Sequence, residues 1–402
     1  MIGSKAMCSN TSTIQTDVVV IGLGAMGAST LYQLAKRGER VLGIDRFVPP
    51  HAKGSSHGGT RVTREAVGEG PAYVPLAVRS HEIIADLEKE FGETFLVKSG
   101  TLIVGSPMNG ATPLHGAQDF LASSIAMAEQ FGVEHEILNA EQLRARYPQF
   151  RSFRDTDRGY LEPNAGYMLP EALIDAQIKG AKVLGAEVMT DTIVEKLEQV
   201  DGKVVVHTSD GTVHAKRAVV AAGGWTRGLL GAPFDRILTV TRQTIHWYDA
   251  DDFAPFAPEK MPVFIWFVTD RLEDYFTGFP VTDPQEGVKM VASRDTPDID
   301  HEAIGPKAER WESDDFYNKH VGPNMVGVKP DVVNNATCFY TNTPDNGFII
   351  DAHPEMDKVI VVSACSGHGF KHSLGIGEAV AQVIHDGKSK IDLSAFNLAR
   401  FL

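Results

Sequence analysis

Alternating apolar and polar segments at the start of the chain predict a strand, a helix and a second strand in succession. The run 18–21 is continuously apolar, which is typical of a parallel strand buried on both faces. Apolar residues then recur at helical spacing over 28–35, and Gly38 marks the end of the helix. A second apolar run over 41–44 ends at Asp45. This order predicts one complete βαβ unit.

Beyond this unit the pattern changes, because predicted strands follow one another with few helices between them. Segments rich in β-branched or alternating apolar residues predict strands over 96–105, 237–248, 262–269 and 287–292. These segments have no βαβ rhythm, so we expect them to form an antiparallel sheet.

The other predicted elements return to the alternation of strands and helices. They are a helix over about 74–91, a helix and a strand over 170–190, a hairpin over 203–219, and a strand over 358–362 followed by a helix through about His385. Two folding units therefore interleave along the chain. An α/β unit uses its start, middle and end, and an antiparallel unit is inserted between these parts.

The length of 402 residues agrees with two domains of about 100–200 residues each. The predicted fold class is α/β, or α+β overall, with a Rossmann-like nucleotide-binding domain and an interleaved antiparallel-sheet domain. We expect a flexible tail over 1–16, the Rossmann-like domain over 17–92, 152–228 and 334–402, and the antiparallel domain over 93–151 and 229–333.

Composition and charge exclude several classes of partner. The chain is 43% hydrophobic, as in ordinary globular proteins, and its 52 acidic and 38 basic residues give a net charge of −14. Such a surface repels phosphate backbones and anionic lipids, so we expect neither a nucleic acid nor a membrane as partner. No apolar run reaches the ~18 residues of a spanning helix. Cys8, Cys338 and Cys365 are too few for a disulfide framework or a zinc site, which indicates a reduced, cytoplasmic protein without a metal.

A glycine motif joins the first predicted strand to its helix. Gly22, Gly24 and Gly27 follow the G-x-G-x-x-G spacing, and Asp45 ends the next strand about twenty residues later. The glycines let the backbone approach a pyrophosphate at the helix N-terminus, while the carboxylate can accept a hydrogen bond from a ribose hydroxyl. The alternative is a tight turn that binds nothing. The motif alone cannot separate FAD from NAD.

Two polar loops carry groups that suit an anion. The segment 54–64 holds Arg61 and Arg64, whose planar guanidinium groups match a carboxylate or a phosphate. The segment 367–372 follows a predicted strand and opens a helix, which places backbone amides against an anion. The alternatives are a solvated surface loop and a flexible connector, respectively.

Two further residues have both an ordinary and a chemical interpretation. Cys338 alone is typical of a small buried apolar residue. Lys289 interrupts an apolar strand pattern. Burial of a lysine there would destabilise the fold unless its charge is paired or has a role in catalysis, although the side chain can also face outward. Gly375 and Gly377 lie inside the last predicted helix and indicate close packing against a flat surface.

Together these segments resemble the monomeric sarcosine oxidase and N-methyltryptophan oxidase group of the D-amino-acid-oxidase-like flavoproteins. The likeness runs from about Asp17 to Phe401. The most specific stretches occur in order and at matching spacings, and they are Ser56-His57-Gly58-Gly59-Thr60-Arg61, the run 68–76, the run 338–345 and the run 366–371.

The resemblance implies that the dinucleotide is FAD. Cys338 falls on the family cysteine that forms a thioether to the flavin, and Lys289 falls on the lysine beside the flavin ring that activates dioxygen. The first domain is then an FAD-binding domain and the second a substrate domain. The other residues that we expect to bind the flavin are Gly22, Gly24, Gly27, Asp45, Arg46, Ser56, His57, Thr60, Arg61, Gly223, Trp225, Gly367, Gly369, Phe370 and Lys371.

The resemblance also implies a substrate site. Arg64 and Lys371 fall on the pair that binds the substrate carboxylate, and Tyr340 and His368 line the pocket. Two positions that face the substrate depart from the family pattern. Thr277 stands where close relatives carry a tyrosine before the Gly-Phe-Pro turn, and Ser293 stands where they carry a histidine. Smaller side chains open the pocket to a larger or differently substituted amine.

We therefore expect an FAD-dependent oxidase of a secondary amine, such as an N-methyl or other N-alkyl amino acid. A hydride leaves the carbon next to nitrogen, the imine hydrolyses, and dioxygen is reduced to hydrogen peroxide. The amine and dioxygen are the expected partners of a monomeric protein. The alternatives are an amine dehydrogenase of the same fold with another electron acceptor, and a flavin-binding protein without catalysis. The C-terminal motifs disfavour an NAD-dependent dehydrogenase.

Overall fold

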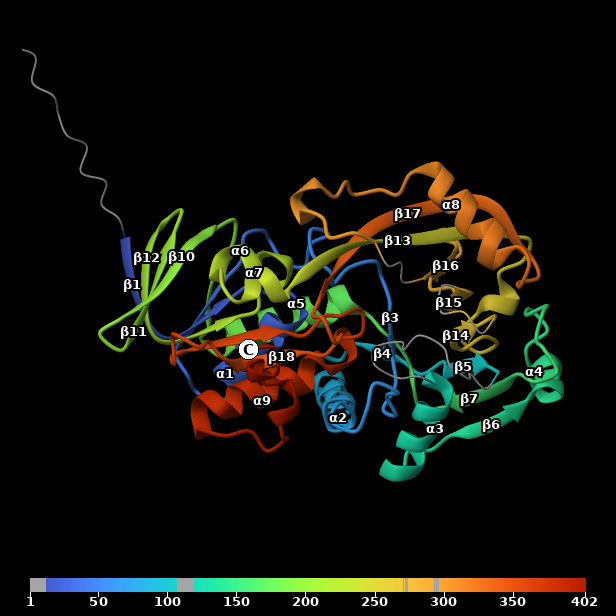
Figure 1. The fold of residues 1–402 in the computed structure, drawn as a ribbon, viewed down its shortest axis with the longest axis horizontal. Helices are drawn as coiled ribbons and strands as arrows, with labels where there is room; N and C mark the ends of the chain where they lie inside the picture. Colours follow the sequence, from blue (N-terminus) through green and yellow to red (C-terminus); the bar gives the residue numbers. More distant parts are fainter. Residues whose placement is uncertain (1–11, 107–118, 270, 272–273, 293–295) are drawn as a thin grey trace, which may run out of the picture.

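The computed structural model describes residues 12–402 apart from 107–118, 270, 272–273 and 293–295. Two large sheets occupy opposite ends of the molecule, and each combines segments that are distant in the sequence (Figure 1). This mixed α/β architecture confirms the predicted fold class.

The first sheet is built around β1 (Ser12–Ile21), which pairs in parallel with β2 (Val41–Ile44) and β12 (Gly211–Val220) on either side. Its spatial order is β10-β11-β12-β1-β2-β9, with β19 beside β12 and β18 beside β19. The other strands are β9 (Glu187–Met189), β10 (Val194–Val200), β11 (Lys203–Thr208), β18 (Ile349–Ala352) and β19 (Val359–Ser363).

The helices of this unit share one apolar core with the sheet. They are α1 (Ala25–Lys36), α2 (Val74–Phe91), α5 (Pro170–Val183) and α9 (Ser373–Asp386). Figure 1 shows α1, α2 and α9 gathered along the same side of the sheet. The apolar stripe predicted over 28–35 lies in this core, and the predicted βαβ unit is confirmed.

The two glycines of the last helix mark its closest contacts. A Cβ atom on Gly375 would lie 2.4 Å from the Leu76 carbonyl oxygen of α2, and one on Gly377 would lie 2.2 Å from the Ser29 hydroxyl oxygen of α1. Close packing was expected, but the neighbours are two helices rather than a flat surface. Both contacts require the absence of a side chain.

The second sheet has the spatial order β17-β13-β16-β15-β14-β5-β7-β6. Its neighbours pair antiparallel, as predicted, except that β5 and β14 are parallel. The strands are β5 (Thr101–Gly105), β6 (Glu136–Asn139), β7 (Arg158–Glu162), β13 (Thr239–Ala250), β14 (Val263–Phe267), β15 (Tyr275–Gly278), β16 (Val288–Val291) and β17 (Val328–Asn342).

A small third sheet lies between the two large ones. Its strands are β3 (Arg61–Thr63), β8 (Gly166–Met168) and β4 (Leu96–Val97), in this spatial order. The remaining helices are α3 (Phe120–Phe131), α4 (Ala140–Arg146), α6 (Thr226–Leu230), α7 (Phe234–Ile237) and α8 (Arg310–Phe316). None of the described helices has both the length and the apolar character that a bilayer crossing requires.

The structure corrects several predicted boundaries. Residues 12–16 pair with β12 and extend β1, so they are not part of a flexible tail. The segment 158–162 is β7 of the second sheet, and β17 continues that sheet through Asn342, beyond the predicted boundary at 334. Residues 96–105 form two strands in different sheets, because Gly100 turns the chain with a φ of +81°.

We predict that Gly375→Ala destabilises the fold by about 1–3 kcal/mol, because the new methyl group must displace the α2 backbone. Gly228→Ala is the matched control, since it also lies in a helix but a Cβ atom there meets no described atom within 4 Å. This control is expected to be neutral or stabilising by up to about 1 kcal/mol. Urea unfolding measures both changes, and equal effects of the two substitutions would contradict the packing argument.

Candidate active site

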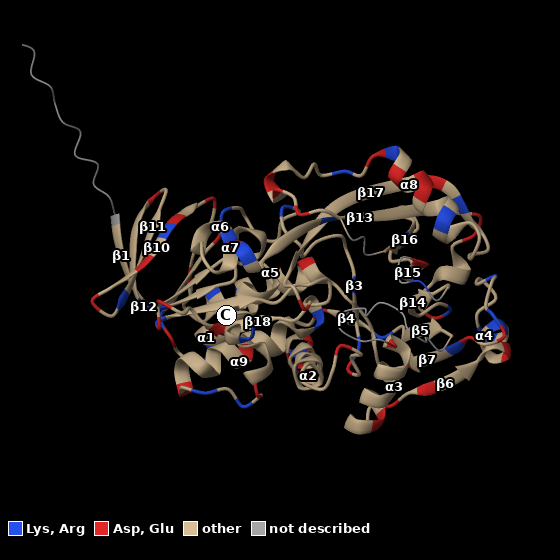
Figure 2. Ribbon diagram, viewed as in Figure 1, with Lys and Arg blue, Asp and Glu red and all other residues tan. Residues whose placement is uncertain are grey.

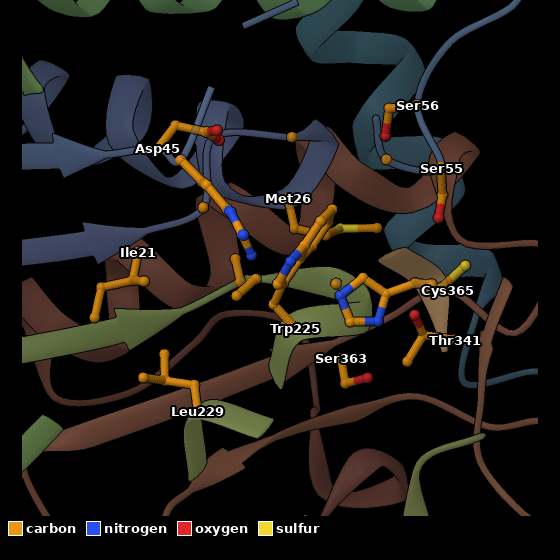
Figure 3. A pocket seen from close by; sticks show the side chains of 18 of the residues that line it. Ile21, Met26, Asp45, Ser55, Ser56, Trp225, Leu229, Thr341, Ser363 and Cys365 are labelled. Carbon is orange, nitrogen blue, oxygen red and sulfur yellow. The ribbon is translucent and has the colours of Figure 1, made fainter. Parts of the chain in front are cut away.

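A large cavity of about 670 Å³ lies beyond the carboxyl ends of β1 and β2. Figure 3 shows side chains from several distant segments pointing into it, among them Asp45, Trp225 and Thr341. Eight of the residues predicted to bind the cofactor line this cavity, namely Gly22, Gly24, Asp45, Arg46, Ser56, Gly223, Trp225 and Phe370.

Two glycines of the motif, Gly22 and Gly24, line the large cavity. Gly22 has a φ of +88°, and a Cβ atom there would lie 2.6 Å from the Ala221 carbonyl oxygen. Gly27 lies behind the turn, where a Cβ atom would meet the Gly22 carbonyl oxygen at 1.7 Å. Gly24 is open, since a Cβ atom there would meet only Ser56 Oγ, at 3.9 Å. The turn therefore leaves room for a phosphate group to approach the backbone at Gly24.

Asp45 holds this turn and also faces the large cavity. Its Oδ2 accepts a hydrogen bond from the Leu23 amide at 2.7 Å, and its Oδ1 accepts one from the Phe47 amide at 2.8 Å. His51 Nε2 also lies 3.4 Å from Oδ1, whereas Oδ2 has a further lone pair that a ribose hydroxyl can use. The predicted role of Asp45 is compatible with this geometry, and Asp45 has a structural role as well.

Polar atoms in the cavity wall indicate that the ligand is polar. The hydroxyl oxygens of Thr341 and Ser363 are buried there without a hydrogen-bond partner among the described residues. A buried hydroxyl group without a hydrogen bond destabilises the fold unless a ligand or a water molecule forms that bond. Together with the open glycine turn, they fit a dinucleotide.

A second, smaller cavity has a volume of about 130 Å³. Phe370 lines both cavities, which places them next to each other. It brings together the five residues predicted for catalysis, which are Arg64, Lys289, Tyr340, His368 and Lys371. Three residues predicted to bind the cofactor, Arg61, Cys338 and Gly367, also line it. Figure 2 marks the positions of charged residues along the ribbon, many of them on the outer helices such as α4 and α8. Arg64, Lys289 and Lys371, by contrast, are only 2%, 4% and 3% exposed. Buried cations of this kind require partners.

Lys289 on β16 is held by backbone and hydroxyl oxygens. Its Nζ donates hydrogen bonds to the Gly58 carbonyl at 2.7 Å, to the Thr60 carbonyl at 2.8 Å and to Thr60 Oγ1 at 3.0 Å. It also lies 4.6 Å from the centre of the Phe279 ring. Burial and the nearby Arg61 guanidinium lower the pKa of Lys289 well below its ordinary value. The alternative of an outward-facing strand lysine is therefore wrong.

Arg64 and Lys371 meet on one buried carboxylate, that of Glu69. Arg64 Nη2 donates to both Glu69 oxygens at 3.1 Å, and Lys371 Nζ donates to Oε1 at 2.9 Å. The Glu69 side chain is 1% exposed. Burial lowers the pKa of Lys371 to about 8, and the Glu69 carboxylate opposes this shift. Both cations thus share a carboxylate of the protein itself, and their binding of a substrate carboxylate, which the resemblance implies, stays a prediction.

A second buried acid positions the loop that carries Arg64. Glu162 on β7 accepts hydrogen bonds from the Glu65 amide at 2.6 Å and from the Ala66 amide at 3.2 Å. The Tyr160 hydroxyl donates to the same carboxylate at 2.9 Å. Two hydrogen bonds thus fix the backbone next to Arg64, and the third holds the Glu162 carboxylate in place, which restricts where the Arg64 guanidinium can reach.

The two described cysteines face different cavities. Cys338 on β17 lines the small cavity, and Cys365 lines the large one. Burial raises the pKa of the Cys338 thiol, while Arg61 and Lys289 oppose that rise. Cys338 therefore lies beside the cationic residues predicted to surround the reactive end of the cofactor. Cys8 lies outside the described residues.

His368 and its loop close one side of the small cavity. Its Nε2 is 2.9 Å from the Asn346 carbonyl oxygen, and its ring stacks on Phe348 with centres 4.6 Å apart. Tyr340 lines the cavity from β17. Gly369 lies behind the loop, because a Cβ atom there would meet the Ala364 carbonyl oxygen at 1.8 Å.

Four predicted cofactor residues line neither cavity directly. Gly27 and Gly369 lie behind their turns, while His57 and Thr60 are buried in the loop beside Lys289. Burial, reinforced by Arg61, lowers the pKa of His57 to about 4, so this imidazole is neutral near pH 7. These residues shape the site rather than form its surface.

The sequence analysis missed several residues of the small cavity. Glu69 lay within a quoted motif but was given no role, and Phe120 and Tyr275 were not singled out at all. Thr277 does line the cavity, in agreement with the expectation that it faces the substrate. Ser293 lies outside the described residues. The sequence did contain a signal for Glu69 that was not used: it lies between two glycines, five residues after Arg64.

Comparison with known proteins identifies the family. The sequence model of the FAD dependent oxidoreductase family matches residues 17–383. The chain belongs to this family. It is 35% identical over 390 residues to the monomeric sarcosine oxidase of Streptomyces avermitilis, an alignment that covers 96% of this chain and 97% of the relative. It is 34% identical over 391 residues to the N-methyl-L-tryptophan oxidase of Yersinia pestis, with 96% and 99% coverage.

Solved structures agree on the fold of this FAD-dependent oxidoreductase. NikD, an unusual amino acid oxidase essential for nikkomycin biosynthesis, superposes with a TM-score of 0.79 at 23% identity and covers 96% of this chain and 97% of its own. The L-proline dehydrogenase of P. horikoshii has the same TM-score at 21% identity, with 97% and 98% coverage. The family is FAD-dependent, so the dinucleotide that the large cavity fits is FAD. In the described part of the chain, no group of His, Cys, Asp or Glu side chains is arranged to hold a metal ion.

Proposed function

We propose that this protein is an FAD-dependent oxidase of N-alkyl amino acids. The observation that carries the proposal is the buried pair Arg64 and Lys371, which shares the carboxylate of Glu69 in a small cavity next to the cofactor cavity. The relatives named monomeric sarcosine oxidase and N-methyl-L-tryptophan oxidase support a secondary amine as the substrate.

The substrate carboxylate is proposed to bind where the two cations converge. A guanidinium and an ammonium offer several charge-assisted hydrogen bonds, and burial strengthens them. The contacts of both groups with the Glu69 carboxylate support this proposal. Binding in this way fixes the amino acid, so that its amine and α-carbon lie in the remaining part of the cavity.

Bound FAD supplies the hydride acceptor. The surrounding residues exclude water and hold the amine as a neutral base, which is the form that can release a hydride from the adjacent carbon. Lys289 is proposed to stabilise the negative charge that develops on dioxygen, since its ammonium is fixed by three oxygen acceptors beside Cys338 and Arg61. The products are an imine, which hydrolyses, and hydrogen peroxide.

The substrate of the small cavity is proposed to be a larger or differently substituted amine than sarcosine. Phe120, Ile265, Tyr275 and Thr277 line the cavity together with the cations. Thr277 is smaller than the tyrosine of the resembling relatives, and it therefore leaves space for a substituent on the amine or on the α-carbon.

Two alternative functions are compatible with the same fold. A dehydrogenase with another electron acceptor is compatible with it, because the L-proline dehydrogenase superposes as well as NikD does. Lys289 favours the oxidase, since a buried cation in this place promotes the reaction with dioxygen. A flavin-binding protein without catalysis is disfavoured by the joint presence of Lys289, Arg64 and Lys371.

We also propose a monomeric, cytoplasmic enzyme, supported by the name of the sarcosine oxidase relatives and by the low cysteine content.

The proposed function predicts that N-methyl amino acids bleach the flavin under anaerobic conditions and yield hydrogen peroxide in air. A panel that includes sarcosine, larger N-methyl amino acids and cyclic amino acids measures both reactions. A substrate that bleaches the flavin but yields peroxide slowly would favour the dehydrogenase. If no amine of the panel reduced the flavin, the proposed function would be wrong.

Carboxylate binding is predicted to weaken as the pH rises past about 8, because the Lys371 ammonium loses its proton there. Propionate is a suitable probe, since it has no amine that titrates, and its Kd can be measured from the perturbed flavin spectrum. Below this pH both cations are charged and binding is tightest. In Lys371→Arg the charge persists, so the weakening should disappear. The same loss of affinity in the arginine variant would show that another group titrates.

Cys338 is predicted to form the covalent link to FAD. Acid-precipitated protein should then remain yellow, and its intact mass should exceed that of the chain by one FAD. Cys338→Ser should release the flavin into the supernatant, because a hydroxyl oxygen is a far weaker nucleophile than a thiolate.

Cys365→Ser is the matched control for this experiment, since Cys365 lines the neighbouring cavity. It should keep the flavin attached. Attachment that survives Cys338→Ser and is lost in Cys365→Ser would overturn the assignment of Cys338.

A further inference from the structure

The loop that holds Lys289 is itself held by a carboxylate from another element. Glu171 lies in the first turn of α5, and its Oε1 accepts hydrogen bonds from the Gly58 amide at 2.6 Å and from the Gly59 amide at 3.2 Å. Gly58 and Gly59 both have positive φ, +101° and +79°. This backbone conformation is strained for other residues, and it directs both amides toward one acceptor.

The same turn presents its oxygens to Lys289 on the opposite side. The Gly58 carbonyl accepts from Lys289 Nζ, and so do the carbonyl and hydroxyl oxygens of Thr60. The peptide groups around Gly58 therefore connect Glu171 to Lys289 through the backbone. Polarisation along such a chain of hydrogen bonds makes the carbonyl a better acceptor for the ammonium.

The charges around the turn show why an acid is needed here. Arg61 Nη1 donates to the Thr60 carbonyl at 2.9 Å, so two cations share one oxygen. Burial and Arg61 both lower the pKa of Lys289, whereas Glu171, Cys338 and Glu286 raise it, in decreasing order of effect. His57, in the same loop, is neutral near pH 7. Glu171 thus provides the strongest opposing charge that faces this cluster.

We propose that Glu171 is the positioning residue of Lys289, because it fixes the Gly58–Gly59 turn that holds the Lys289 side chain and places a negative charge beside it. The inference rests on the proposed role of Lys289 toward dioxygen. Glu171 lines neither cavity, so it acts through the turn and through its charge rather than by contact with a substrate. A carboxylate in the first turn of a helix can also stabilise that helix alone, and the experiment must separate these roles.

Three variants of the holoenzyme make this separation. Glu171→Gln keeps an oxygen that can accept from both amides but removes the charge, and Glu171→Ala removes both. Asp175→Asn is the matched control, because Asp175 lies one turn further along α5 and pairs with Lys179 at the surface.

The first readout is hydrogen exchange of the Gly58 and Gly59 amides. Glu171→Ala should accelerate it by roughly tenfold or more, as expected when a bond to a charged acceptor is lost. Glu171→Gln should retain most of the protection, and Asp175→Asn all of it. Unchanged protection in Glu171→Ala would overturn the positioning role.

The second readout is the rate of flavin reoxidation by dioxygen as a function of pH. In the wild type it should fall as the pH rises and Lys289 loses its proton. Glu171→Gln should move this fall to lower pH, because the opposing charge is gone, while anaerobic reduction by the substrate is unchanged. A purely structural role would leave the pH profile in place.

Lys289→Met separates failure of the inference from failure of the proposed function. If Lys289→Met slows reoxidation and Glu171→Gln leaves its rate and pH profile as in the wild type, the inference about Glu171 is wrong and the proposed function stands. If Lys289→Met reoxidises as fast as the wild type, the role of Lys289 and the inference fall together.

Discussion

Three cationic side chains are buried around one small cavity, and the electrostatic cost of burying them constrains the structure on every side. Arg64 and Lys371 are compensated by Glu69, and Lys289 is compensated by the oxygens of the 58–60 loop. A buried charge without such partners would be several kcal/mol less stable. The acids and carbonyls that surround the cavity are therefore required by the cations, and the cations are required by the proposed chemistry.

Both sheets and the loops between them contribute to this arrangement. Lys289 comes from the second sheet, and Lys371 comes from the short 3-10 helix Phe370–His372 before α9. Glu162 on β7 fixes the loop that carries Arg64. The two cavities meet at Phe370, so a dinucleotide that begins at the glycine turn can present its far end to the cations. The interleaving of the two units is what places these residues together.

The sequence predicted the parts of this account that depend on local pattern. The βαβ unit, the glycine motif and the carboxyl-end position of Asp45 follow from apolar periodicity and spacing, and the structure confirms them. The roles suggested for Arg64, Lys289 and Lys371 came from a resemblance, and their burial in one cavity agrees with it. The partners Glu162 and Glu171 could not be predicted, because their contacts join residues far apart in the sequence, whereas Glu69 lies only five residues after Arg64. The assignment of residues 158–162 to the first domain differs from the structure for the same reason, since these residues pair with β5 and β6 of the second sheet.

The central claim is that the buried cations select substrates with a carboxylate, and one comparison tests it directly. The anaerobic rate of flavin reduction is measured with an N-methyl amino acid and with its primary amide, which has the same shape but no negative charge. The account predicts that the amide reduces the flavin more slowly by about 100-fold or more, since it cannot form the charge-assisted hydrogen bonds that a substrate carboxylate makes with Arg64 and Lys371. Equal rates for the acid and the amide would contradict it.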